Sequence, residues 1–206
     1  MNNQRGQSMT EFIIVMPVML LLILGAIQFI LIYQAKSTLN YATFEAARAG
    51  SLENASRKSV DNGFTRGLAP MFARFRTTHK EGSGYGELAK KVIVARELAR
   101  NEVTDGQVKI ELLNPTPQMF QAFDNNTIPN DHLAFRQNEN GINLQDANLL
   151  KLRVTYCMKL IVPMISKIIK EVAGGACKGN EPRFPIVSSS IIRMQSPAIQ
   201  CDGCFD

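Results

Sequence analysis

The sequence has little of the side-chain chemistry that enzymatic sites usually combine. Its 206 residues include only two histidines, His79 and His132, and both fall in polar loop sequence. Neither has the spacing of a metal ligand or a catalytic triad, and no Gly-x-Ser-x-Gly elbow is present. We therefore expect no catalytic residues, no metal and no cofactor.

A signature of nucleic-acid recognition is also missing. The net charge is +5, but the basic residues are scattered and often stand near acids, as Lys90 and Lys91 do beside Glu87. No recognition helix, zinc finger or RNA-binding motif accompanies them. The positive charge is typical of a solvated surface, and we expect no nucleic-acid partner.

Charge is absent from one long segment near the N-terminus. From Phe12 to Tyr33 there is no Asp, Glu, Lys or Arg. As an α-helix, this run would extend about 33 Å, which matches the ~30 Å hydrocarbon thickness of a bilayer. Pro17 lies in the first turns, where it can kink the helix without ending it. The run predicts a membrane-spanning helix.

Hydropathy leaves two other interpretations of this run open. A secretory signal peptide would have Arg5 as its basic region and a cut near Ala26, but its apolar part is usually only about 7–15 residues long. A plain uncleaved signal anchor is equally compatible with the apolar run.

Glu11 separates these interpretations. A carboxylate at the mouth of a spanning helix is costly to bury, so it usually has a partner or a task. Glu11 stands five residues after Gly6, behind a short leader that contains Arg5. The simpler alternative is that Glu11 only favours the helix N-terminus through the macrodipole.

The segment from Arg5 to Gly50 resembles the TadE-like family, the minor pilins or pseudopilins of tight-adherence (Flp-type) pilus systems. The resemblance rests on three pieces: Glu11-Phe-Ile-Ile-Val-Met-Pro17, Gly25-Ala-Ile-Gln-Phe29 and Ala46-Ala-Arg-Ala-Gly50. Gln7 stands where better-known type IV pilins have a methylated Phe, which favours the Flp/Tad branch.

The resemblance implies a processing site and a set of partners. A prepilin peptidase would cut between Gly6 and Gln7, and Glu11 would pair with the amino terminus of a neighbouring subunit. Phe12 would open the assembly helix. The expected partners are other pilin-like subunits, Tad pilus assembly proteins, the peptidase and the membrane. The protein would be a single-pass inner-membrane protein with its head outside the cytoplasm, and it could enter a surface pilus.

Helical sequence continues past the apolar run and then gives way to strands. Small residues at Ala35, Ala42, Ala46 and Ala49 indicate either a packing stripe or simple helix propensity, with Gly50 as the helix end. The spacing of glycines and Pro70 predicts a broken helix over 56–76, and a second helix follows over 87–103. Alternation predicts strands at 108–112, 150–156 and 186–194, with a long loop over 124–144.

An apolar segment from Met158 to Val172 is too short and too charged for a second span. Lys167 and Lys170 would let it lie at the membrane surface. Packing on the sheet is the alternative, and the sequence favours it.

All four cysteines, Cys157, Cys177, Cys201 and Cys204, fall in the last quarter of the chain. In an oxidising extracytoplasmic compartment we expect two disulfides. Three pairings are possible. We favour Cys157 with Cys177 and Cys201 with Cys204, although cross-pairing competes because the terminal loop would be tight. Zinc is disfavoured because a second closely spaced pair is absent.

Together these patterns predict an α+β protein with a long N-terminal transmembrane helix and a small extracytoplasmic head that has a few antiparallel strands. The expected divisions are a leader over 1–6, a transmembrane and extended helix over 7–50, and the head over 51–206. The predicted function is that of a minor pilin or pseudopilin. The alternative is an uncleaved, membrane-anchored extracytoplasmic binding protein that is independent of a pilus.

Overall fold

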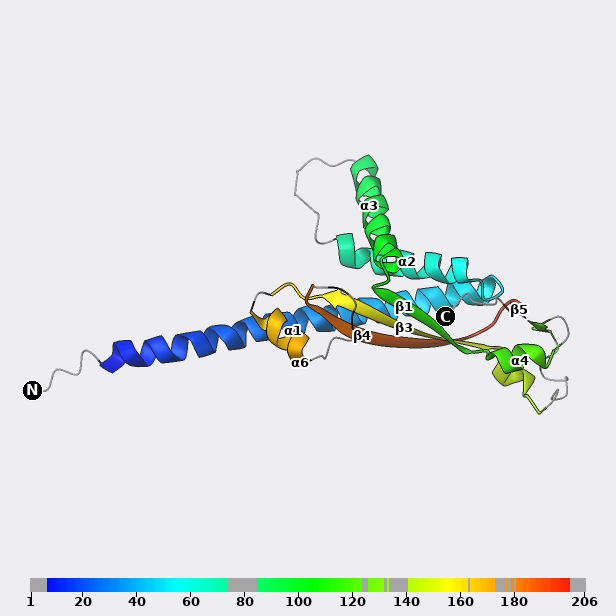
Figure 1. Ribbon diagram of the computed structural model, residues 1–206. Coiled ribbons are helices and arrows are strands. Elements are labelled where there is room, and N and C mark those ends of the chain that lie inside the picture. Colours follow the sequence, from blue (N-terminus) through cyan, green and yellow to red (C-terminus); the bar gives the residue numbers. More distant parts are fainter. Residues whose placement is uncertain are drawn as a thin grey trace, which may run out of the picture. The chain divides into compact units, whose positions relative to one another are not determined.

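The computed structural model describes residues 7–73, 85–123, 126–131, 133, 141–162, 164–172, 177, 179 and 181–200. The chain divides into two compact units, and each is described by itself. The anchor unit comprises Met1–Ala35 and Cys157–Pro185, and the head unit comprises Lys36–Tyr156 and Ile186–Asp206. The observed elements confirm the predicted α+β class, with a long apolar N-terminal helix and antiparallel strands (Figure 1).

Helix α1 runs without interruption from Gln7 to Leu52. Pro17 lies inside it and does not end it. A proline at this position removes the hydrogen bond to the carbonyl four residues earlier, which can kink a helix while the flanking turns continue. The predicted end at Gly50 is two residues early. The chain leaves the helix through Asn54 and Ala55, which both have positive φ, and the Ala55 amide donates to the Gly50 carbonyl over 2.9 Å.

A three-stranded sheet has the strand order β1-β3-β4. The strands are β1 (Val108–Asn114), β3 (Leu149–Lys159) and β4 (Arg183–Arg193), and β1 pairs antiparallel with β3. The three predicted strands are therefore present, each extended by a few residues. The alternation in β3 is confirmed, since every second side chain is at most 2% exposed: Leu150, Leu152, Val154 and Tyr156.

Two short elements lie where a single loop over 124–144 was predicted. Strand β2 (Thr127–Ile128) pairs antiparallel with β5 (Ala198–Ile199), and helix α5 (Leu144–Ala147) begins at the end of the predicted loop. Helix α4 (Pro117–Gln121) was also not predicted. A two-residue strand has no periodicity of its own, so only its partner reveals it.

Helix α2 (Arg57–Ala73) is continuous, so the predicted break within 56–76 is wrong. Its Gly63 and Gly67 face the last turns of α1. A Cβ on Gly67 would lie 2.6 Å from the Cα of Ala42, and a Cβ on Gly63 would lie 2.8 Å from the Cβ of Ala49. The two glycines allow α2 to cross α1 closely. Ala42, Ala46 and Ala49 of α1 form the packing stripe that they contact within the head unit.

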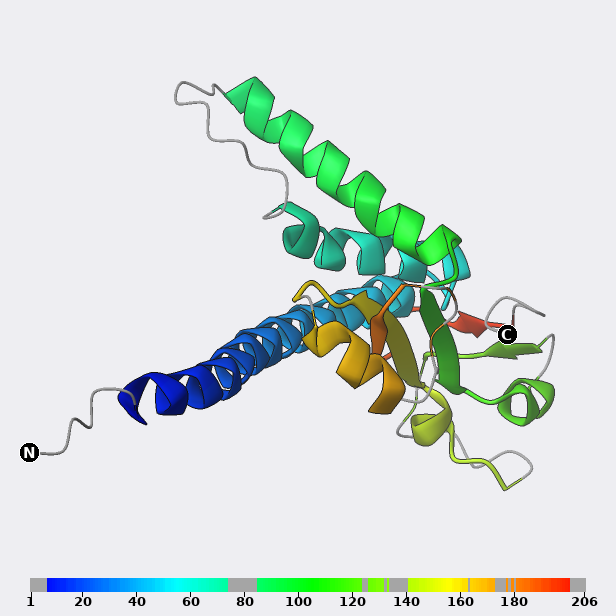
Figure 2. The ribbon, with the colours of Figure 1, turned by 60° about the vertical axis from the view of Figure 1, so that its left-hand side comes forward.

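Helix α3 (Tyr85–Thr104) packs against α2 (Figure 2). Ala95 and Ala99 of α3 are buried, whereas Val92 is 49% exposed. Also within the head unit, two hydrogen bonds join α1 to β4. The Lys36 ammonium donates to the Val187 carbonyl, and the Ser188 hydroxyl donates to Asn40 Oδ1 over 2.9 Å.

Candidate functional site

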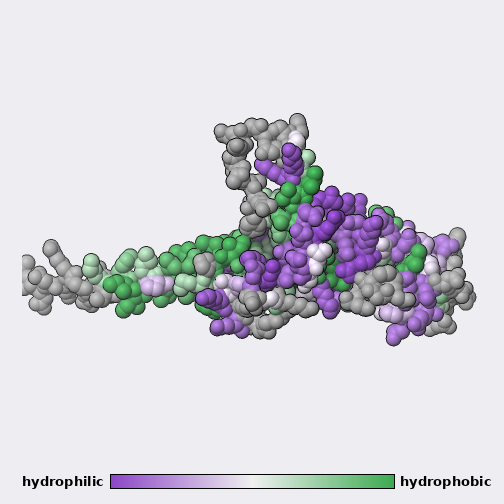
Figure 3. All heavy atoms as spheres, turned by 45° about the horizontal axis from the view of Figure 1, so that its top comes forward, coloured by the Kyte–Doolittle hydropathy of each residue, from purple (hydrophilic) through white to green (hydrophobic). Residues whose placement is uncertain are grey.

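The first part of α1 exposes large apolar side chains on every side. Figure 3 shows one face of this apolar surface. Side chains that are more than half exposed include Phe12, Ile13, Ile14, Val15, Val18, Met19, Leu22, Ile23, Phe29 and Ile30. A helix that is apolar all round needs lipid or other apolar helices around it. By length and composition, α1 can cross a membrane.

The sequence-predicted residues at the helix entry lie in the first turns of α1. Gln7 is its first residue, and Glu11 follows in the second turn with an exposed side chain. Phe12 is 65% exposed and begins the apolar surface. Gly6, the residue before the predicted cut, lies outside the described residues.

Gln28 has a structural role in the anchor unit that was not predicted from the sequence. Its side chain is fully buried, and its Oε1 accepts a hydrogen bond from the Val162 backbone N–H over 3.0 Å. Burying an amide without a partner is costly, so this bond ties the segment after β3 to the spanning helix within the anchor unit. The signal in the sequence was the single amide among apolar residues.

The segment that Gln28 holds leads into helix α6 (Ile165–Val172). The predicted apolar stretch from Met158 to Val172 therefore has three parts: the end of β3, a turn, and α6. Ile165 and Ser166 are buried, whereas Lys167 and Ile168 are exposed.

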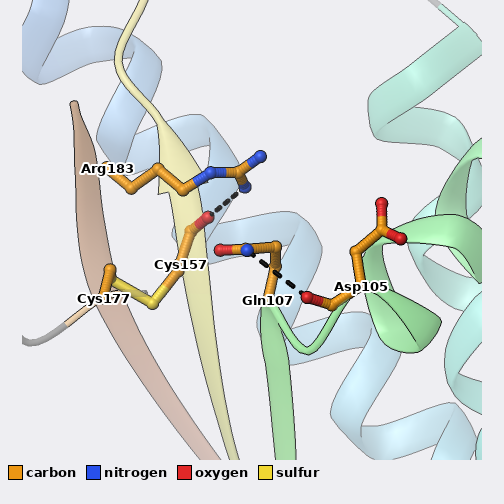
Figure 4. The surroundings of a disulfide bond; sticks show 5 residues. All are labelled: Asp105, Gln107, Cys157, Cys177 and Arg183. Atoms are coloured by element: carbon orange, nitrogen blue, oxygen red, sulfur yellow. Dashed lines mark hydrogen bonds between the residues drawn. A yellow bond between two sulfur atoms is a disulfide. The ribbon is translucent and has the colours of Figure 1, made fainter. Parts of the chain in front are cut away.

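A disulfide joins Cys157, at the end of β3, to Cys177, beyond α6, with their Cα atoms 5.7 Å apart (Figure 4). This is the first of the two pairs that the sequence favoured. Arg183 of β4 donates to the Cys157 carbonyl over 2.9 Å, which fixes the strand end that carries the disulfide (Figure 4). Cys201 and Cys204 lie outside the described residues.

A small charge cluster accompanies the disulfide. Lys159 Nζ lies 2.6 Å from Glu181 Oε1, and Arg183 approaches the other carboxylate oxygen at 3.5 Å. The hydrogen bond from Lys159 holds the pKa of the Glu181 carboxyl below its usual range, and Arg183 adds to this effect. The pair therefore persists at neutral pH and is lost as the pH falls through that lowered pKa. Because the side chains of Lys159 and Glu181 are about half exposed, their ion pair stabilises the fold little.

Among the described residues, no three His, Cys, Asp or Glu side chains gather where they could hold a metal ion. The described residues instead form one apolar helix that can cross a membrane and a disulfide-bonded α+β part, which is the architecture of a membrane-anchored protein.

The family model of the TadE-like protein matches residues 6–48. This confirms the resemblance read from the sequence and indicates a pilin-like, membrane-anchored protein associated with a Tad pilus. The match covers the spanning helix and its extension, and it leaves the strands unmatched. No significant match to the chain was found among curated proteins or among solved structures.

Proposed function

We propose that this chain is a minor pilin or pseudopilin that a prepilin peptidase cuts between Gly6 and Gln7. The observation that carries the proposal is the spacing at the start of the matched segment. The TadE-like match starts at residue 6, and the acidic Glu11 lies in α1 five residues further on, directly before the exposed apolar side chains that begin at Phe12. The new amino terminus would then lie one helical turn from a carboxylate.

The physical role of the cut is to change the charge at the helix entry. Removing residues 1–6 takes away Arg5 and leaves a positive amino group at Gln7. About 6 Å of helix rise separates Gln7 from Glu11, so a neighbouring helix shifted by one turn can place its amino terminus beside Glu11. An opposite charge offsets the cost of holding a carboxylate at the edge of the bilayer.

The role of the chain in this proposal is structural and includes no catalytic step. The apolar face of α1 would pack with other pilin-like subunits, and the chain would help to initiate, prime or stabilise a Tad/Flp-type surface pilus for adhesion or secretion. The head would lie outside the cytoplasm, in the oxidising compartment that suits the Cys157–Cys177 disulfide.

The N-terminus of the membrane-purified protein tests the processing step. When the full chain is produced with its cognate peptidase, intact mass and N-terminal sequencing should give a chain that starts at Gln7. A Gly6→Leu variant should keep the leader, because a bulky side chain replaces glycine beside the cut bond. A chain that starts at Met1, while the peptidase processes a control prepilin, would sink the proposal and favour an uncleaved membrane-anchored binding protein.

The Glu11→Gln variant tests the assembly step. It should still start at Gln7, but recovery of other pilin-like subunits by crosslinking in the membrane should fall at least about tenfold, since breaking a desolvated charge pair is costly. Glu53→Gln is the matched control, because Glu53 is an exposed acid beyond the end of α1. Unchanged crosslinking in Glu11→Gln would remove the proposed role of this carboxylate.

A further inference from the structure

The turn and helix after β3 expose large apolar side chains beside the spanning helix. Ile161, Met164 and Ile168 are 49%, 63% and 50% exposed, whereas their neighbours Val162 and Ile165 are buried. We call Ile161, Met164 and Ile168 the exposed trio. Exposed aliphatic side chains on a short, amphipathic segment are typical of a surface that another apolar phase covers.

The position of the segment along α1 indicates what that phase is. The Val162 backbone N–H is hydrogen-bonded to Gln28, which lies five residues before Tyr33, the last residue of the predicted membrane-spanning run. Five residues correspond to about 7.5 Å along a helix axis. The segment is therefore held about 7.5 Å inside the head-side end of the membrane-spanning run. Interfacial helices bury their apolar face about 5–10 Å into the boundary between headgroups and acyl chains.

The covalent structure keeps the segment in this place. The Cys157–Cys177 disulfide joins the strand before the segment to the chain beyond α6, so both ends of the segment are tied together. The buried Ile165 and Ser166 anchor the first turn of α6. The exposed Lys167 adds positive charge, which a bilayer surface with anionic headgroups attracts.

We propose that the segment from Ile161 to Glu171 is a second membrane contact, which lies in the head-side interface of the bilayer with the exposed trio at the headgroup–acyl boundary. The contact would fix the rotation and depth of α1 in the bilayer before assembly. This inference rests on α1 spanning the membrane, and it is independent of whether the leader is cut.

The absence of tryptophan from the sequence makes a direct test possible. Ile161→Trp, Met164→Trp and Ile168→Trp each give a full-length chain with a single fluorescent reporter at an exposed site. Each variant is placed in nanodiscs of phosphatidylcholine and phosphatidylglycerol at one chain per disc. Lipids brominated at carbons about 6–7 or about 11–12 of the acyl chain then report depth.

Shallow bromine should quench the three reporters at least about twofold more than deep bromine does, as an interfacial position requires. Leu22→Trp, in the middle of the spanning run and 61% exposed, is the reference for a reporter deep inside the bilayer. Ile199→Trp is the matched control on the head unit, because Ile199 is also 49% exposed and no bilayer contact is proposed for it. Formation of the Cys157–Cys177 disulfide in each variant, checked by peptide mass, shows that the segment is folded.

Two results would overturn the inference. The first is quenching of the three reporters no stronger than that of Ile199→Trp in discs where Leu22→Trp is quenched. The second is a blue shift of their emission that requires two chains per disc, because it would mean that a second copy of the chain covers the exposed trio. Three separate positions keep the outcome independent of any one substitution.

Discussion

Replacing Gly67 with leucine should lower the free energy of unfolding of the head unit by about 3 kcal/mol or more, the upper range for overpacking a core. The cause is the closeness of α1 and α2. A Cβ on Gly67 would lie 2.6 Å from the Cα of Ala42, which is backbone and cannot rotate away. The two helices would have to separate along their whole contact.

The contact that would be lost is built from small side chains on both helices. Ala42 and Ala46 of α1 are fully buried, and Gly63 and Gly67 of α2 meet them. An ion pair between Arg66 of α2 and Glu45 of α1, at 3.1 Å, crosses the same contact. Small residues allow this close approach, and side chains such as Phe64 and Leu68 of α2 fill the core beside it.

Hydrogen exchange of the α2 amides in the full-length protein measures this effect, because it reports the opening of α2 while the spanning part of α1 stays helical. Gly86→Ala is the matched control: Gly86 also lies in a helix, and nothing is within 4 Å of a Cβ built there. It should change the opening free energy by at most about 0.5–1 kcal/mol. Equal protection in Gly67→Leu and Gly86→Ala would contradict the close crossing.

Removing the disulfide with the pair Cys157→Ala and Cys177→Ala should destabilise the segment between them by about 3 kcal/mol, the value for closing a loop of this size. The cysteines are 20 residues apart in sequence, and the enclosed chain includes the Val162 amide bonded to Gln28. Without the crosslink, the unfolded segment gains the entropy of an open loop. The Gln28 bond and the packing of Ile165 must then hold it alone.

Exchange of the Leu160, Val162 and Ser166 amides reports the loss, because each of these backbone N–H groups donates a hydrogen bond in the folded segment. The control is a chain with Cys201→Ser and Cys204→Ser, which should keep the protection until a reductant is added. Protection that survives both the alanine pair and the reductant would show that the disulfide contributes nothing to this segment. A loss in the alanine pair without a loss on reduction would point to the cavity left by the Cys157 side chain.

Patterns of short range in the sequence were enough to predict the main elements. The uncharged run predicted the spanning part of α1, since a helix with apolar residues on every side is either buried in a protein core or spans a membrane. Alternation predicted β3, because its buried side chains recur at every second position from Leu150 to Tyr156. The residues from Gly6 to Glu11 contributed to the TadE-like resemblance, and the family match over 6–48 confirms that resemblance.

Glycines were misread because their meaning depends on a distant partner. By propensity, Gly63 and Gly67 interrupt a helix, and the sequence therefore predicted a break. In the structure, the same residues lie at the crossing with α1, where packing outweighs the roughly 1 kcal/mol that each glycine costs a helix.

Local sequence patterns were sufficient to predict the anchor helix, its charged entry and the strands β1, β3 and β4, because each of these depends on neighbours within a few residues. Only the tertiary structure decided that the alanines of α1 meet the glycines of α2, that Cys157 bonds to Cys177, and that Gln28 holds the segment before α6. These are contacts between residues that lie far apart in the sequence, from 14 positions for Gly63 and Ala49 upward. They depend on how the chain returns upon itself, which no local pattern specifies.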